Sequence, residues 1–292
     1  MSTPNLALFE PDPKQLLLHA MEMRWNNYCD EHKRCRSEFT EEAVHDLRVA
    51  TRRMLALIQL LNSISPRPRL KKMARAFKDQ LDEFDSLRDT QVILAGLSEI
   101  LDEIPQLEEF EEYLHSREEQ MLQDLRRKLK KRDTSELARW VRKTQETIEV
   151  GRGDDLKSMT LEAVDDAFLV TRQRLGWVDL TRSATIHRVR VAFKAFRYMV
   201  EIVHPLVQGF PTTILKQTND YQTLMGNIQD VEVFAQTLAG FIQDTSLPDI
   251  DVIHGYYERR RSIALSTYAE AMDTLHTFWR PAPDQPFPWQ QI

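Results

Sequence analysis

The sequence has 292 residues, a formal net charge of −6 and two cysteines. This length allows one large or two moderate domains, and the acidic average means that net charge alone does not favour an anionic partner. No apolar run approaches the roughly 20 residues that span a membrane, and residues 1–14 hold no apolar segment typical of a signal peptide.

An all-α fold is predicted, because good helix formers fill the long stretches and no run alternates apolar and polar residues as a half-buried strand does. In the first half we expect helices over residues 13–30, from 40 to just before Pro66, over 69–103 with a bend or break, and over 105–131. A short helix follows. Asp133 is expected to be its N-cap and Glu136 the capping residue three positions later. In the second half, after Gly151 and Gly153, we expect helices from 154 or 155 to 175, and over 183–204, 211–243 and 248–279. The tail over 280–292 is expected to be docked or frayed.

The two halves repeat one another at a nearly constant offset. The segment HDLRVATR from His45 matches HRVRVAFK from His187, an offset of 142, and LRDTQV from Leu87 matches IQDVEV from Ile228, an offset of 141. Arg117 matches Arg259, again at 142. Three matches in one register predict an internal duplication, with related helical bundles over residues 1–150 and 151–292.

The first repeated segment places cations on one side of a helix in each half. At about 100° per residue, steps of three and seven return to nearly the same side, and the second-half cations fall within an arc of roughly 80°. Like charges stacked in this way repel unless an anion lies between them, and unpaired clusters of Arg, Lys and His form phosphate sites. The alternative is an ordinary solvated helix face. The residues are His45, Arg48 and Arg52, and His187, Arg190, Lys194 and Arg197.

These segments resemble the signature of the CHAD domain, the conserved histidine α-helical domain. HDLRVATRR from His45 to Arg53 resembles the first copy of the motif, and HRVRVAFKAFRY from His187 to Tyr198 resembles the second. The stretches 84–92 and 225–233 resemble the LG-x-x-RD-x-x-V element of that family. The sequence departs from the pattern at Asp85, which replaces the first Gly of this element, and at Gln229, which stands where the first half has Arg88.

The resemblance implies a fold of two four-helix bundles related by an approximate two-fold axis, with a basic channel between them. It also implies non-catalytic binding of inorganic polyphosphate and association with polyphosphate granules. Arg53 then joins the seven residues above as a candidate ligand. Further basic positions are candidates with a competing role in surface salt bridges: Arg75, Lys78, Lys216, Arg117 and Arg259.

Two other functions are alternatives to polyanion binding. His45-Asp46 is an HD doublet like those of metal-dependent phosphohydrolases, but the second copy has Arg188 in place of the aspartate, and no P-loop or H-E-x-x-H motif is present. We therefore predict no catalysis, no metal and no cofactor. Nucleic-acid binding would need aromatic residues among the cations, and Phe193, Phe196 and Tyr198 fit a core role better.

The two cysteines give an indication of the cellular compartment. Cys29 and Cys35 stand six residues apart and face different sides of a helix, which favours reduced thiols and a cytoplasmic protein. The expected partner is polyphosphate, and no association with a membrane is expected. The sequence predicts nothing about the oligomeric state.

Overall fold

The computed structural model describes residues 11–151, 155–243 and 250–290, and within these ranges every regular element is helical. The all-α prediction is confirmed. Gly153 and the predicted helix starts at Asp154 and Pro248 lie outside the described residues. No helix in the described ranges is long and apolar enough to cross a membrane.

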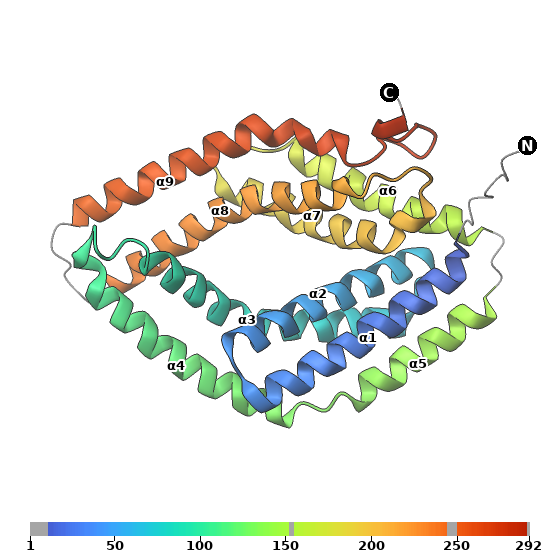
Figure 1. Ribbon diagram of the computed structural model, residues 1–292, viewed down its shortest axis with the longest axis horizontal. Helices are drawn as coiled ribbons and strands as arrows, with labels where there is room; N and C mark the ends of the chain where they lie inside the picture. Colours follow the sequence, from blue (N-terminus) through green and yellow to red (C-terminus); the bar gives the residue numbers. More distant parts are fainter. Residues whose placement is uncertain (1–10, 152–154, 244–249, 291–292) are drawn as a thin grey trace, which may run out of the picture.

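Two groups of helices lie against each other (Figure 1). The first group packs around α2 and α3. It consists of α1 (Pro13–Glu38), α2 (Glu41–Ile64), α3 (Pro68–Leu97), the 3-10 turn η1 (Pro105–Leu107), α4 (Glu108–Lys131) and α5 (Ser135–Val150). The second group is an up-and-down series in which each helix packs on the next. It consists of α6 (Leu156–Leu175), α7 (Ser183–Val203), η2 (His204–Leu206), α8 (Thr213–Phe241), α9 (Ile250–Ala271) and η3 (Met272–Thr277).

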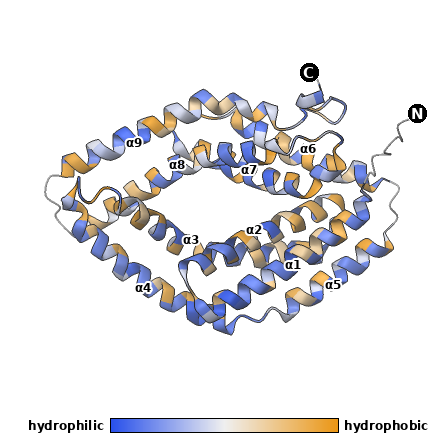
Figure 2. Cartoon of the chain, in the orientation of Figure 1, coloured by the Kyte–Doolittle hydropathy of each residue, from blue (hydrophilic) through white to orange (hydrophobic). Residues whose placement is uncertain are grey.

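Hydrophilic and hydrophobic residues alternate along the helices, as expected for amphipathic segments that bury one side (Figure 2). The start of α2 follows from its sequence. Thr40 is the N-cap and accepts a hydrogen bond from the Ala43 N–H at 3.2 Å, and two glutamates occupy the first turn, where the helix dipole favours them. The predicted beginning near residue 40 is confirmed.

Four predicted helix boundaries were wrong. The last helix, α9, ends at Ala271, and the 3-10 turn η3 follows it before the predicted end near residue 279. α1 continues to Glu38, eight residues beyond the predicted end, and closes at Phe39, which adopts a left-handed conformation with φ 51°. α3 ends at Leu97 and is one uninterrupted helix, with turns in place of its predicted last residues. Asp133 bonds to the N–H and hydroxyl of Ser135, and the N-cap, Thr134, makes no side-chain capping bond.

The extension of α1 places both cysteines in the same helix. Cys29 is half-buried, Cys35 is buried, and both are free thiols, as predicted from their spacing. Burial raises the pKa of the Cys35 thiol to about 12, which keeps it protonated and unreactive at neutral pH.

Two apolar clusters hold the helices together. The main cluster contains side chains from both groups, among them Leu57 and Phe77 of the first and Phe193 and Val200 of the second. The smaller one, which we call the distal cluster, joins the ends of α3 and α8 to the beginnings of α4 and α9, at the left of Figure 1. There the Phe110 ring lies 5.7 Å from Phe234 and 5.3 Å from Phe241, centroid to centroid. Each cluster therefore spans both groups of helices.

The tail after η3 is docked along residues 280–290. Trp279 is fully buried and its indole N–H donates to Asp165 Oδ1 at 2.7 Å. Arg280 holds the same carboxylate with two bonds, at 2.9 and 2.6 Å. Phe287 is buried against Trp279. The three donors to the buried Asp165 carboxylate fix the tail on α6. Of the two expectations for the tail, docked or frayed, the described residues are docked.

Candidate functional site

Two helices, one from each group, bring together the basic positions of the repeated motif. α2 and α7 are in contact, and each carries two cations one helical turn apart on the side facing the other group. The charges of Arg52 and Lys194 act on each other across this contact. We call the group, with the carboxylates beside it, the inter-bundle cluster; its members are Arg48, Arg52, Arg190, Lys194, Asp85, Asp89 and Asp230.

The cations of the cluster are withdrawn from water. Arg48 is only 4% exposed, and Arg52, Arg190 and Lys194 are half-buried. Burial lowers the pKa of Arg52 to about 10, with the neighbouring charge of Arg48 adding to the effect. Burial, together with the charges of Arg52, Arg190 and Arg48, lowers the pKa of the Lys194 amine to about 6. Desolvation and like charge act in the same direction here, because both disfavour the charged form of a base.

Arg48 is already neutralised within the chain. Its Nη2 lies 2.8 Å from Asp85 Oδ1, and its Nη1 donates to the Leu81 carbonyl oxygen at 3.2 Å. Asp85 is one of the departures from the family pattern, and in this chain it forms an ion pair with Arg48. Arg48 is therefore not on a solvated helix face, which was the alternative to a ligand role, because α3 covers it.

Two further carboxylates face the cluster, one from α3 and one from α8. Burial raises the pKa of both Asp89 and Asp230, while the positive charges nearby, Arg190 among them, lower it. The two aspartates occupy matching positions of the repeated LRDTQV and IQDVEV segments. Both carboxylates act on Arg190 and offset part of its positive charge.

Three basic side chains of the cluster make no direct ion pair with the residues that the structure describes. Arg52, Arg190 and Lys194 make neither an ion pair within 4 Å nor a hydrogen bond to any residue that the structure describes. The Nε–H of Arg190 is buried without a hydrogen-bond partner in the described part of the chain. An unpaired buried donor costs stability, so this group of cations is suited to an external anion.

Arg53 and Arg197 lie in a different group. Arg197 is 9% exposed, donates to Gln222 Oε1 at 3.0 Å and pairs with Glu201 at 2.9 Å. Arg53 is 3.7 Å from the other oxygen of Glu201. Arg24 of α1, which sequence reasoning missed, donates to the Arg53 carbonyl at 2.6 Å, and burial lowers its pKa to about 10. Arg197 is therefore paired within α7 and does not join the unpaired basic residues of the inter-bundle cluster.

The two histidines of the motif are exposed. His187 Nδ1 is 2.6 Å from Gln229 Oε1, so the second departure from the family pattern also has a contact in this chain. His45 makes no hydrogen bond or ion pair with the described residues. Both rings stand near the start of their helices, one turn before the arginines of the cluster.

The remaining candidates are not brought to the cluster. All five side chains are exposed on the outer parts of the helices. Arg75 pairs with Asp79 at 3.9 Å, and Lys216 pairs with Asp220 at 2.6 Å, each within its own helix. These two have the surface salt bridges that were the alternative to ligand contact; the others are Lys78, Arg117 and Arg259.

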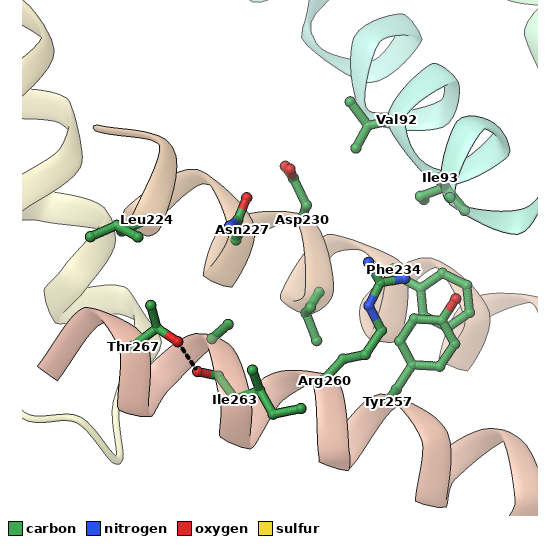
Figure 3. Close-up of a pocket in the computed structure, with 13 residues that line it drawn as sticks. Val92, Ile93, Leu224, Asn227, Asp230, Phe234, Tyr257, Arg260, Ile263 and Thr267 are labelled. Carbon is green, nitrogen blue, oxygen red and sulfur yellow. Dashed lines mark hydrogen bonds between the residues drawn. The ribbon is translucent and has the colours of Figure 1, made fainter. Parts of the chain in front are cut away.

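A pocket of about 410 Å³ lies between α3, α8 and α9 beside the cluster. Figure 3 shows an apolar lining that includes Val92, Ile93 and Ile263, with the Asp230 carboxylate at its edge toward α3. Arg260, Phe234 and Tyr257 line the end of the pocket in the same view. The apolar lining does not suit a multiply charged polymer, so we place the candidate site on the cations of α2 and α7.

Residues considered for other functions have structural contacts. Asp46 of the HD doublet forms an ion pair with Arg34. Within the described ranges, no three His, Cys, Asp or Glu side chains form a group that could hold a metal ion. Phe193, Phe196 and Tyr198 are buried, as predicted, and are therefore not available to stack on bases.

Comparison with known proteins agrees with the fold and the motifs. No curated protein matches the sequence. The structure is similar to the crystal structure of the CHAD domain from the plant Ricinus communis, with a TM-score of 0.67 and 18% sequence identity over 91% of each chain. The sequence pattern of the CHAD domain family matches residues 20–239. This match covers most of the chain and includes α2, α3, α7 and nearly all of α8, so the protein belongs to the CHAD domain family.

Proposed function

We propose that this protein binds inorganic polyphosphate without catalysing a reaction, and that the polymer lies along the inter-bundle cluster in a basic channel. The observation that carries the proposal is the group of unpaired cations, Arg52, Arg190 and Lys194, contributed by both bundles. A linear polymer of phosphates presents a negative charge at each unit, so one chain can contact both helices. The family resemblance supports the same ligand.

The cluster contains groups for holding phosphate rather than for cleaving it. Guanidinium groups bind phosphate oxygens with paired hydrogen bonds. The three carboxylates of the cluster lie beside arginines, where they balance charge. The proposal therefore assigns them no role as acid or base.

The test is the affinity for long-chain polyphosphate, measured by calorimetry on the double variant Arg52→Gln/Arg190→Gln. A charge-assisted hydrogen bond contributes about 1.5–3 kcal/mol, so the loss of two should weaken binding by roughly a hundredfold or more. Both side chains are unpaired in the free protein, and their replacement should leave the melting temperature unchanged or slightly higher.

A matched control removes the same number of charges elsewhere. Arg127 and Arg139 are exposed and pair with Asp124 and Glu136 in their own helices. The variant Arg127→Gln/Arg139→Gln should bind with nearly the original affinity. Equal losses in the two double variants would mean that only overall charge matters, and would refute the assigned site.

The cellular part of the proposal is a cytoplasmic protein that associates with polyphosphate granules. A fluorescent fusion should colocalise with granules in cells that make polyphosphate and become diffuse in cells that do not. The Arg52→Gln/Arg190→Gln fusion should be diffuse in both. Granule association of this double variant would show that another surface directs it there.

A further inference from the structure

Lys194 differs from every other cation of the inter-bundle cluster because a lysine amine can lose its charge. It lies on α7 between arginines of both bundles, is half-buried, and has no hydrogen bond or ion pair with any described residue. Arginine stays protonated in proteins, whereas lysine changes its protonation state readily when it is buried. The position therefore combines a titratable base with three fixed positive charges.

The charged groups that act on Lys194 come from four helices. Arg48 and Arg52 project from α2 and Arg190 from α7 itself, and all three disfavour an ammonium group. Asp85 from α3 favours it but is already paired with Arg48. Asp230 from α8 interacts with Lys194 more weakly than with Arg190. Burial and the three arginines prevail over the carboxylates, and the pKa of the amine falls to about 6.

We propose that Lys194 is a neutral amine in the free protein and takes up a proton when a polyanion occupies the cluster. This inference rests on the proposed function. A bound phosphate supplies the negative charge that the site lacks, and it lies against the same arginines that expel the proton from Lys194. The ammonium form is then favoured, and it donates hydrogen bonds to the phosphate oxygens.

The consequence is binding that depends on pH. At pH 7 a group with a pKa of about 6 is roughly nine-tenths deprotonated, so each binding event should take up about 0.9 proton. Affinity should fall as the pH rises above 6, by up to about tenfold per pH unit while the bound lysine stays protonated. The free protein thus keeps its site closer to neutrality, and the full positive charge develops only around the ligand.

Proton uptake is measured by titrating long-chain polyphosphate into the protein at pH 7 in buffers with different ionisation enthalpies. The slope of the observed enthalpy against the buffer enthalpy gives the number of protons. Lys194→Met should reduce the slope to near zero. Lys194→Arg should also reduce it, yet keep binding and flatten its pH dependence. Lys128→Met, the same change at an exposed lysine of α4, should leave the slope unchanged.

Other groups could also take up a proton beside a polyanion, namely His45, His187, Asp89 and Asp230. The double variant His45→Gln/His187→Gln and the double variant Asp89→Asn/Asp230→Asn should each retain an uptake of about 0.9 proton. If the uptake persists in Lys194→Arg and disappears in either of these variants, the assignment to Lys194 is wrong.

A second readout follows the lysine directly. Trace acetylation by acetic anhydride, quantified by mass spectrometry over a pH series, reports the protonation midpoint of each lysine. The midpoint of Lys194 should lie near 6 in the free protein and above 8 with polyphosphate present. An ordinary midpoint near 10 in the free protein would overturn the inference even if polyphosphate binds. Absence of binding at pH 6 would refute the proposed function, and this inference with it.

Discussion

His32 is a buried side chain whose protonation state should influence folding. It is 6% exposed, and its Nε2 has no hydrogen-bond partner among the residues that the structure describes. Burial lowers its pKa to about 4, with Arg36 and Arg132 adding to the shift. In the unfolded chain the pKa returns to about 6.5. The unfolded state therefore binds more protons between pH 6.5 and 4, and the contribution of His32 to stability is lost as the pH falls through this window.

We expect the replacement His32→Gln to reduce the acid sensitivity of the fold. Between pH 7 and 4.5, the loss of unfolding free energy in the wild type should exceed that in the variant by about 2 kcal/mol. Denaturant titrations at the two pH values measure this difference. His115→Gln, at an exposed histidine on α4, serves as the control, and an identical change in both variants would show that His32 does not titrate as described.

Single residues also show where prediction from sequence ends. The period of the repeated motif was enough to place Arg52, Arg190 and Lys194 on one side of their helices, and the family resemblance implied that the two halves meet at a basic channel. It did not reveal that Arg48 is covered by α3 and paired with Asp85, because that contact joins residues 37 apart. Arg24 carries no local signal, since only the packing of α1 on α2 brings it to Arg53. The end of α1 was misplaced because no Gly or Pro marks the left-handed residue Phe39.

At the scale of elements, α3 and α8 each place a carboxylate near the basic residues of α2 and α7. Asp89 and Asp230 stand at equivalent points of these two helices and act on Arg190 from both sides. In the free protein they offset the positive charge of the cluster. A bound polyanion must approach them, so their negative charge works against binding.

The double variant Asp89→Asn/Asp230→Asn should therefore bind polyphosphate more tightly, by roughly three- to tenfold at low salt. The asparagines retain the shape of the side chains, and the measurement is calorimetric affinity at fixed ionic strength. The gain should shrink at high salt, where charges are screened. Weaker binding in this variant would mean that the aspartates position Arg190 for the ligand rather than repel it.

At the scale of the whole molecule, the proposed site depends on both bundles. α2 and α7 supply the unpaired cations, and the main apolar cluster holds these helices against each other. A short anion can contact only some of the cations, whereas a long chain reaches all of them. Affinity for a chain should therefore grow with the number of phosphates.

Orthophosphate at millimolar concentration should compete poorly with long-chain polyphosphate, and affinity should rise with chain length until the polymer spans the cluster. Calorimetry over a series of defined lengths tests this expectation. The Arg52→Gln/Arg190→Gln variant should show a shallower rise. Equal affinity for short and long chains would place the contact at a single cation.

The separation of the distal cluster from the main core implies that the molecule has two levels of local stability. The distal cluster is the smaller of the two and joins only the ends of four helices, so it should open in partial unfolding events that leave the main core intact. Backbone amides near Phe110 and Ile253 should accordingly exchange with deuterium sooner than those near Leu57 and Val200. Such openings do not require any contact between α2 and α7 to break. Polyphosphate bound between these helices should therefore protect the amides of the central helices more than those of the distal end.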